Sequence, residues 1–249
     1  MKDVMMESNE GLHDAMFKRR SVRRYEEEGL DEVTLGEVRS FVGTLRPLFP
    51  DIRTEFRLLS PSEVKGLFKT GSPHYLALFS ERKGEYLANA GFMLQQADLF
   101  FSSKGIGSCW QGTPKPSREV RAADGLEYVI MIGFGRGKGE VHRDISEFKR
   151  KPMEEITDIE GARELLEGAR LAPSAINAQA WFFTGSADAI DVYRGRSSLT
   201  DRSKQIDAGI AMCHIWLAAM HAGKKVGTAV ESGKEQRKGF EYVATMRLT

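Results

Sequence analysis

The stretch Glu85–Gly112, EYLANAGFMLQQADLFFSSKGIGSCWQG, predicts more about the fold than any other part of this 249-residue chain. Its first part, residues 85–104, indicates a long helix, and Gly105 is typical of a helix end. The glycines that follow permit close backbone approach to a ligand, and Trp110 is able to wall a pocket. The simpler interpretation is a helix C-cap followed by a core tryptophan.

The same pattern occurs a second time. The helix is entered through Asn89-Ala90-Gly91, and a second predicted helix, residues 204–222, is entered through Asp207-Ala208-Gly209 and ends at Gly223. Two similar strand starts follow in the same order, Gly125-Leu126-Glu127-Tyr128-Val129 and Gly239-Phe240-Glu241-Tyr242-Val243. Order and spacing favour an internal duplication, with residues 1–152 and 153–249 as its halves. Two copies would pack about a pseudo-twofold axis, as a fused homodimer would.

The remaining elements predict an α+β fold. Residues 34–48 form a predicted helix, with Thr34 and Glu37 as its capping box and Leu45 on its apolar face. A further amphipathic helix covers residues 159–171 and stops before Pro173. Short apolar runs predict strands at 56–59, 75–79, 127–134, 181–184 and 241–248.

Composition excludes several functions. The chain is 41% hydrophobic and 29% charged with a formal net charge of +1, which gives no general attraction to nucleic acid or acidic membranes. No apolar run is long enough to span a bilayer, and the first ten residues lack the apolar core of a signal peptide. Cys109 and Cys213 lack metal-ligand spacing. We therefore expect a cytoplasmic protein with reduced thiols, no metal, no membrane and no nucleic-acid partner.

Two further segments carry groups suited to ligand binding. Residues 18–25, KRRSVRRY, place guanidinium groups around a hydroxyl, a combination that captures phosphate; the alternatives are a solvated basic face and a nucleic-acid arm. Residues 172–182, APSAINAQAWF, place neutral hydrogen-bonding side chains in a turn between a helix and an aromatic strand. Such a turn suits a planar heterocycle, although Asn177 could equally make turn bonds.

Together these segments resemble the nitroreductase family of flavoproteins. The matching motifs are R-R-S-x-R-x-(F/Y), P-S-x-x-N-x-Q-x-W and G-(I/L)-G-x-x-W, found here at residues 19–25, 173–181 and 105–110. In that family FMN lies at a dimer interface, with the arginine motif and the P-S-x-x-N turn supplied by different subunits. Here the first half lacks the turn and the second half lacks the arginines, as in a duplicated, single-chain subgroup. The resemblance implies a sandwich with a central, mainly antiparallel sheet flanked by helices.

The resemblance also implies which residues bind one FMN per chain. Arg19, Arg20 and Ser21 would hold the phosphate, and Arg23 would lie near the pyrimidine edge of the flavin. The backbone at Gln111 and Gly112 would approach the reactive side of the ring, and the ring would be covered from the other half by Pro173, Ser174 and Asn177. Lys149 and Lys151 match a basic pair that returns to the phosphate, although a charged linker explains them equally well.

The implied activity is transfer of reducing equivalents from NAD(P)H through FMN to a small organic acceptor, of nitroaromatic or quinone type. No side chain is then required as a catalytic acid, base or metal ligand. A flavoprotein with a different reaction and a non-catalytic flavin-binding protein are the alternatives. Gly133-Phe134-Gly135-Arg136-Gly137 follows a predicted strand, but no helix starts there, so it does not indicate a dinucleotide fold. Because the duplication supplies its own dimer interface, we expect a monomer.

Overall fold

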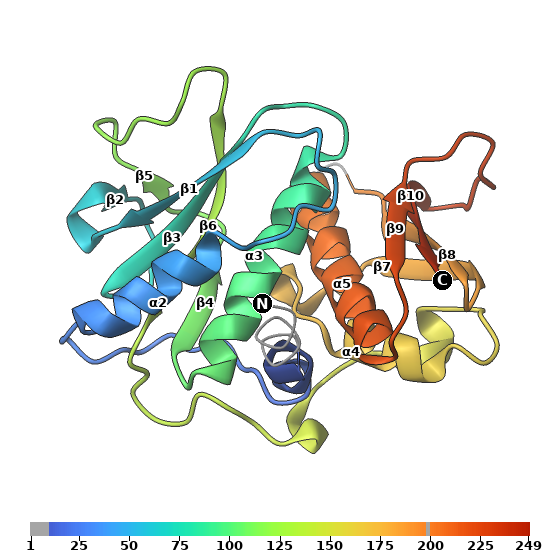
Figure 1. Cartoon of the computed structure of the whole chain (residues 1–249), viewed down its shortest axis with the longest axis horizontal. Helices are drawn as coiled ribbons and strands as arrows, with labels where there is room; N and C mark the ends of the chain where they lie inside the picture. The colour runs from blue at the N-terminus through green and yellow to red at the C-terminus, as the bar shows by residue number, and fades with distance from the viewer. Residues whose placement is uncertain (1–9, 198–199) are drawn as a thin grey trace.

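The computed structural model describes residues 10–197 and 200–249. Two long helices, α3 (Tyr86–Ser103) and α5 (Asp201–His221), lie side by side in the middle of the molecule, between two antiparallel sheets (Figure 1). The first sheet contains β1 (Thr54–Leu59), β3 (His74–Ser80), β4 (Gly107–Gln111) and β6 (Glu127–Gly135). The second contains β7 (Trp181–Ser186), β8 (Ala189–Gly195), β9 (Val226–Ala229) and β10 (Phe240–Leu248).

Shorter elements complete the fold. Helix α2 (Glu32–Val42) precedes the first sheet and helix α4 (Arg163–Leu171) precedes the second. A small two-stranded sheet pairs β2 (Val64–Lys65) with β5 (Lys115–Pro116). Four 3-10 turns are η1 (Pro61–Glu63), η2 (Ile145–Glu147), η3 (Met153–Glu155) and η4 (Ala175–Asn177). No helix in the described part of the chain is long and apolar enough to cross a membrane.

The two sheets share one topology. Their strand orders are β1-β3-β6-β4 and β7-β8-β10-β9, so in each the last strand lies between the second and third. In each, the long helix connects the second strand to the third. The strands are antiparallel, as expected, but they form two sheets where the sequence indicated one central sheet. The reason is that α3 and α5 occupy the centre, and each sheet packs on an outer side of this helix pair.

The contact between α3 and α5 depends on two glycines. A Cβ atom on Gly91 would overlap the carbonyl oxygen of Ile206, and a Cβ on Gly209 would overlap that of Ala88. Each partner lies three residues before the opposite glycine, so the contact is reciprocal, as at a twofold interface. Only glycine allows the two backbones to come this close, which explains why both helix entries carry it.

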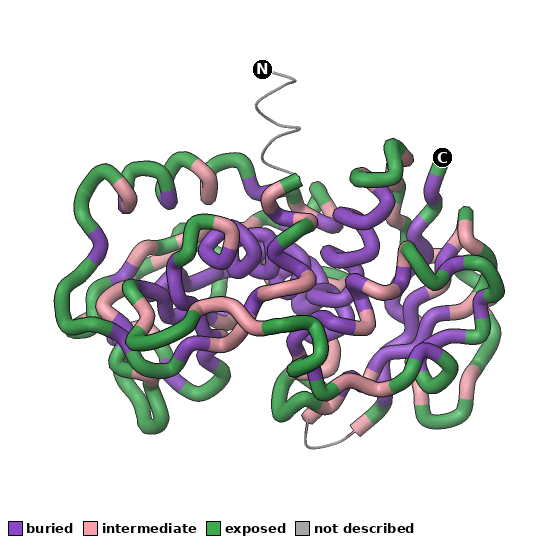
Figure 2. The backbone as a smooth tube through the Cα atoms, turned by 90° about the horizontal axis from the view of Figure 1, so that it is seen from below, coloured by how far each residue is buried: buried purple, intermediate pink, exposed green. Residues whose placement is uncertain are grey.

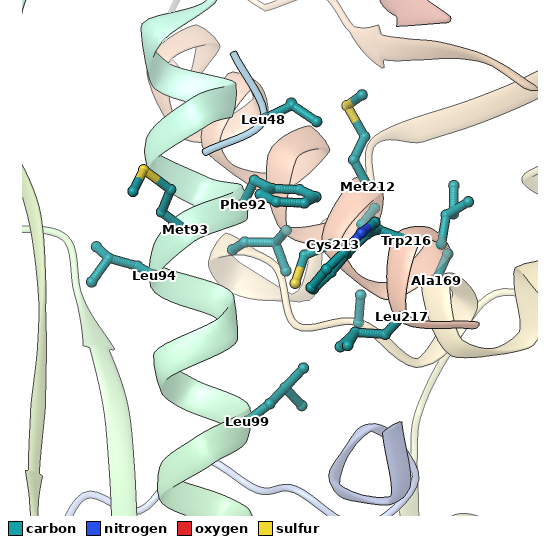
Figure 3. Close-up of a cluster of buried hydrophobic side chains, with 14 of the residues drawn as sticks. Leu48, Phe92, Met93, Leu94, Leu99, Ala169, Met212, Cys213, Trp216 and Leu217 are labelled. Atoms are coloured by element: carbon teal, nitrogen blue, oxygen red, sulfur yellow. The ribbon is translucent and has the colours of Figure 1, made fainter. Parts of the chain in front are cut away.

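Both central helices are buried over most of their length, and the buried residues run through the middle of the molecule (Figure 2). Phe92 of α3 and Trp216 of α5 contact each other in this core, with ring centroids 5.5 Å apart; Figure 3 shows them beside Leu48, Met212 and Cys213. Full burial of one large apolar side chain stabilises the folded state by roughly 1.5–3 kcal/mol. The helix pair therefore forms the main hydrophobic core.

Element ends differ from the sequence predictions where backbone chemistry decides them. Helix α2 begins after Asp31, whose carboxylate accepts from the Thr34 amide, so Asp31 and not Thr34 is the N-cap. The helix ends at Val42, and Leu45, predicted on its apolar face, is buried in irregular chain instead. Helix α4 begins at Arg163, because Gly161 before it adopts a positive φ of 75°.

The glycines of the 133–137 stretch are explained by packing. A Cβ on Gly133 would overlap the Ser72 hydroxyl, and one on Gly135 would overlap the Pro73 ring. The 70–73 segment thus crosses directly over strand β6, and the alternating glycines make room for it. The close approach of residues 70–73 therefore explains Gly133 and Gly135, and no nucleotide-binding role is needed to explain them.

Candidate functional site

The arginine motif is held along strand β4. Ser21 forms a parallel bridge with Ser108, and the Val22 amide donates to the Ser108 carbonyl at 2.8 Å. A Cβ on Gly107 would lie 2.9 Å from Val22 Cγ1, so this glycine permits the crossing. Tyr25 is buried and its hydroxyl donates to the Val22 and Gly133 carbonyls at 2.6 and 3.2 Å. The segment that carries Arg19–Arg23 is therefore fixed against the first sheet.

Arg19 is buried in this segment and forms an ion pair with Asp98 of α3, with 3.0 Å between Nε and Oδ2. Its Nη2 donates to the Ser21 hydroxyl at 3.0 Å, and Asp98 Oδ1 accepts from the Ser108 hydroxyl at 2.6 Å. A charge pair of this kind is tolerated in the interior only when its remaining polar atoms are satisfied. Arg19 thus fixes the Ser21 side chain and has its own charge balanced by Asp98.

The same polar network continues into the core. The Gln95 amide lies 3.1 Å from His214 Nε2, and His214 Nδ1 lies 2.7 Å from the Gly168 carbonyl oxygen. Burial lowers the pKa of His214 to about 3, so its ring is neutral at physiological pH, with Nδ1 donating to Gly168. Gln95 also donates to Asp98 at 3.4 Å, which connects α4 and α5 to the arginine motif.

A cluster of arginines lies next to this network. Arg143 and Arg150 both approach the ring of Phe148, at 3.7 and 5.5 Å from its centroid. The pKa of each is lowered to about 10, first by burial and then by neighbouring guanidinium groups, which are Arg19 and Arg20 for Arg143, and Arg143, Arg19 and Arg170 for Arg150. A lowered arginine pKa means that the positive charges are crowded and desolvated, a situation that a bound anion relieves. We name Arg20, Arg143 and Arg150 the arginine cluster.

The 149–151 segment connects the arginine cluster to the P-S-x-x-N turn. Arg150 Nη1 donates to Asn177 Oδ1 at 2.7 Å, and Asn177 Nδ2 donates to the Lys149 carbonyl at 3.0 Å. Lys149 itself is exposed, and Lys151 Nζ donates to the Gln179 carbonyl at 3.3 Å. The inward-facing residue of the basic trio is therefore Arg150, between the two lysines that the sequence analysis selected.

A cavity of about 300 Å³ opens beside these groups. Its walls come from both parts of the chain: Ser21, Arg23, Cys109, Trp110, Gly112 and Ile130 from the first, and Pro173, Ser174, Ala175, Ile176, Ser203, Ile206, Asp207 and Ile210 from the second. Small-molecule sites are typically concave, mostly apolar and edged by a few polar groups, and this volume suits part of a ligand. Five residues predicted for the site line it, namely Ser21, Arg23, Gly112, Pro173 and Ser174.

The turn that closes the cavity has an unusual backbone. Ile176, Asn177 and Gln179 have positive φ values of 49°, 58° and 46°. Such conformations cost about 1–3 kcal/mol each in non-glycine residues and persist only where the surroundings hold them. Here the Gln179 amide donates to the Ser174 hydroxyl at 2.9 Å, and the Ala175 amide lies 3.1 Å from both carboxylate oxygens of Asp207. Ile176 is 89% exposed at the cavity edge.

Two predicted site residues direct their side chains away from the cavity. Gln111 is buried, its Oε1 accepts from the Thr70 amide at 3.1 Å, and it is not among the residues that line the cavity. Asn177 contacts the 149–151 segment through both side-chain atoms. The sequence analysis missed Arg143, Arg150 and Asp207; the repeated Asp207-Ala208-Gly209 motif was the signal that could have identified Asp207.

No group of three or more metal-ligating side chains occurs within residues 10–197 and 200–249. Cys109 and Cys213 are buried free thiols, and burial raises the pKa of each. These thiols are therefore protonated and poor nucleophiles at neutral pH.

These features define an α+β protein whose cavity is lined by residues from both parts of the chain. Residues 11–219 match the family described as "Putative TM nitroreductase", and the chain belongs to this family, which places it among oxidoreductases. The predicted nitroreductase relationship and fold class are thereby confirmed. Among curated proteins, none matches the chain.

One solved structure shares the fold over nearly the whole chain, and two others match part of the chain. A putative nitroreductase from Thermotoga maritima is 20% identical with a TM-score of 0.64, over 95% of this chain and 93% of that one. A nitroreductase family protein from Clostridium difficile is 15% identical with a TM-score of 0.46, over 58% of this chain and 94% of that one. A putative nitroreductase from Desulfovibrio desulfuricans, solved in complex with FMN, is 17% identical with a TM-score of 0.43, over 58% and 93%.

Proposed function

We propose that this protein is an FMN-dependent oxidoreductase that passes reducing equivalents from NAD(P)H to a small organic acceptor of nitroaromatic or quinone type. The observation that carries the proposal is a mostly apolar cavity with Ser21 and Arg23 in its wall, whose wall segment 173–176 continues to Asn177, the hydrogen-bond partner of Arg150 in the arginine cluster. An FMN molecule has the matching parts, a dianionic phosphate and a planar ring with hydrogen-bonding edges. Because Arg143 and Arg150 are crowded by like charge, the donor set fits a phosphate better than a neutral ligand.

The phosphate would be held by Ser21, Arg20, Arg143 and Arg150. Arg19 would act indirectly, because its charge is balanced by Asp98 and its Nη2 orients the Ser21 hydroxyl. Lys149 and Lys151, proposed from the sequence, remain peripheral candidates near the same position. Arginine forks are suited to phosphate because they donate two parallel hydrogen bonds.

The ring would lie in the cavity between the two parts of the chain. Trp110 and Gly112 line one wall, and Pro173 and Ser174 line the other. The backbone at Gln111, between Trp110 and Gly112 in the sequence, would approach the ring from the first wall. Arg23 contributes positive charge at the cavity, which favours the electron-rich form of a bound ring. FMN, when bound, supplies the redox chemistry, and the side chains bind it, orient it and exclude water.

We further propose one flavin site per chain, with residues 1–152 and 153–249 as the two halves of a duplication. Counting from the reciprocal glycines, Asp98 and Trp216 occupy equivalent positions, seven residues after Gly91 and Gly209. Asp98 anchors the arginine motif, whereas Trp216 packs on Phe92 in the core (Figure 3). The second position thus carries a hydrophobic core where the first carries a charged anchor. A monomer is the assembly that this arrangement favours.

The test is reduction and reoxidation of the reconstituted protein. Under anaerobic conditions NADH or NADPH should bleach the visible absorption of the FMN-loaded protein, and a nitroaromatic or a quinone should restore it. A protein that binds FMN but is not reduced by either nucleotide would favour the non-catalytic flavin-binding alternative. A protein that does not bind FMN would overturn the proposal.

A further inference from the structure

Asp207 is a buried acid in the wall of the proposed flavin cavity. It lies on α5, is 4% exposed, and places both carboxylate oxygens 3.1 Å from the Ala175 amide nitrogen. That amide belongs to the strained turn that closes the cavity. Burial of a carboxylate costs free energy unless it accepts hydrogen bonds, and here the donor is the backbone amide of the turn.

The turn requires such support at its first residues. Its later part is held by side-chain contacts: Ser174 accepts from the Gln179 amide, and Arg150 donates to Asn177. Ala175 precedes the three positive-φ residues and is exposed. Its backbone amide donates to the side-chain carboxylate of Asp207. The acid therefore holds the start of the turn against α5.

The equivalent position in the first half shows what the fold itself requires. Asn89, two residues before Gly91 as Asp207 is before Gly209, accepts with Oδ1 from the Leu48 and Phe49 amides at 2.7 and 3.0 Å. Asn89 is buried and is not part of the cavity wall. The neutral amide oxygen of Asn89 is thus sufficient to hold the chain after α2. At the equivalent position that faces the cavity, the residue is the ionisable Asp207.

We propose that Asp207 is a positioning residue for flavin binding, which holds the 174–179 turn against the cavity and makes flavin affinity depend on pH. This inference rests on the proposed function, because it assigns the turn to the flavin site. Asp207 acts through the turn and through its charge, and it takes no part in the redox step.

Burial raises the pKa of Asp207 to about 7, while the Ala175 hydrogen bond and Lys204 act in the opposite direction. The other titratable groups at the cavity are Arg23 and Cys109. A ring that enters the cavity removes the remaining water near Asp207, which disfavours the carboxylate further. Binding is then accompanied by proton uptake, so affinity should fall as pH rises through about 7.

The test compares Asp207→Asn and Asp207→Ala with Asn89→Ala as a matched control. Asn keeps an acceptor oxygen and removes the charge; Ala removes both. For Asp207→Ala we expect the Kd for FMN to rise roughly tenfold or more, and amides of residues 174–179 to exchange hydrogen faster in the flavin-free chain. For Asp207→Asn we expect an affinity within about threefold of the wild type at pH 6. Asn89→Ala should lower stability without changing affinity.

The pH profile is the second readout. The FMN phosphate titrates near pH 6, but equally in every variant, so the ratio of wild-type to Asp207→Asn Kd values isolates Asp207. This ratio should rise between pH 6 and pH 8; a constant ratio would overturn the pH dependence even if Asp207→Ala failed to fold. Wild-type exchange rates in the turn of Asp207→Ala would overturn the positioning role. Absence of FMN binding by the wild type would instead refute the proposed function, and the exchange experiment would still decide whether Asp207 holds the turn.

Discussion

The direction of the Arg150 side chain determines which residue of the 149–151 segment belongs to the arginine cluster. Arg150 lies between two lysines in a basic trio, and its guanidinium donates to Asn177 Oδ1 and lies near the Phe148 ring. Its burial and its like-charged neighbours are what lower its pKa. Its guanidinium donates to the Leu171 carbonyl and to Asn177 Oδ1, and the proposed phosphate would balance the positive charge that it shares with Arg143.

Replacement of Arg150 by Met should weaken FMN binding through loss of the phosphate contact. We expect the Kd for FMN to rise roughly tenfold to a hundredfold, because charge-assisted hydrogen bonds to phosphate contribute about 1.5–3 kcal/mol. Affinity for riboflavin, which lacks the phosphate, should change much less. The matched control is Lys149→Met on the exposed neighbour, and equal losses in the two variants would contradict the role of Arg150.

Asp98 should matter for stability as well as for the site. Asp98→Asn leaves the buried Arg19 guanidinium without its counter-charge, and breaking such a pair costs about 3–5 kcal/mol. Urea denaturation of the flavin-free protein measures this loss. Asp51→Asn, which breaks the exposed pair with Lys83, is the control and should change the midpoint little. A midpoint for Asp98→Asn close to the wild-type value would show that Arg19 is stabilised by other means.

Five of the eleven residues predicted for the site line the cavity, and the reason is local. Ser21, Arg23, Gly112, Pro173 and Ser174 belong to motifs whose backbone conformation places them at the cavity. Arg150 and Asp207 depend on which way a side chain points after distant segments have packed together. Asn177, predicted to cover the ring, contacts Arg150 with its side chain, because its left-handed backbone directs its amide toward the 149–151 segment.

At the scale of elements, the long helices were the most predictable part. The predicted helix 85–104 and the observed α3 differ by one residue at each end, and the predicted 204–222 helix begins three residues late. Strands β2, β4, β5, β8 and β9 were not predicted; the residues of β4 were interpreted as glycines after a helix C-cap followed by a tryptophan. Both β4 and β9 contain glycine, so their strand conformation depends on pairing with β6 and β10 and not on local preference.

The close contact of α3 and α5 predicts strong effects of small substitutions. Gly91→Ala or Gly209→Ala places a methyl group onto a backbone carbonyl of the opposite helix, so the helices must separate. We expect the free energy of unfolding to fall by about 3 kcal/mol or more, as in severe overpacking. Thermal denaturation with circular dichroism measures it.

Gly36→Ala provides the control for this prediction. Gly36 lies on the exposed side of α2, and a Cβ there meets nothing within 4 Å. Alanine should stabilise that helix by about 0.5–1 kcal/mol. If Gly91→Ala or Gly209→Ala were as stable as Gly36→Ala, the close helix crossing would be wrong.

At the scale of the whole molecule, two sheets of identical topology flank one helix pair with a reciprocal contact. Such an arrangement supports the proposed duplication, in which two subunits are joined in one chain. The arginine motif and its acid anchor lie in one half, and the strained turn lies in the other. The proposed site therefore needs both halves, and it has no charged counterpart at Trp216.

The number of FMN molecules bound per chain tests this account most directly. Flavin-free protein would be titrated with FMN, with bound flavin followed by fluorescence quenching and protein concentration determined independently, on material whose mass in solution is measured by light scattering. One FMN per chain on a monomer is the predicted result. Two per chain would show that the Trp216 side also binds flavin, and one per two chains would show that the site is completed by a second molecule; either would contradict a single site built from the two halves.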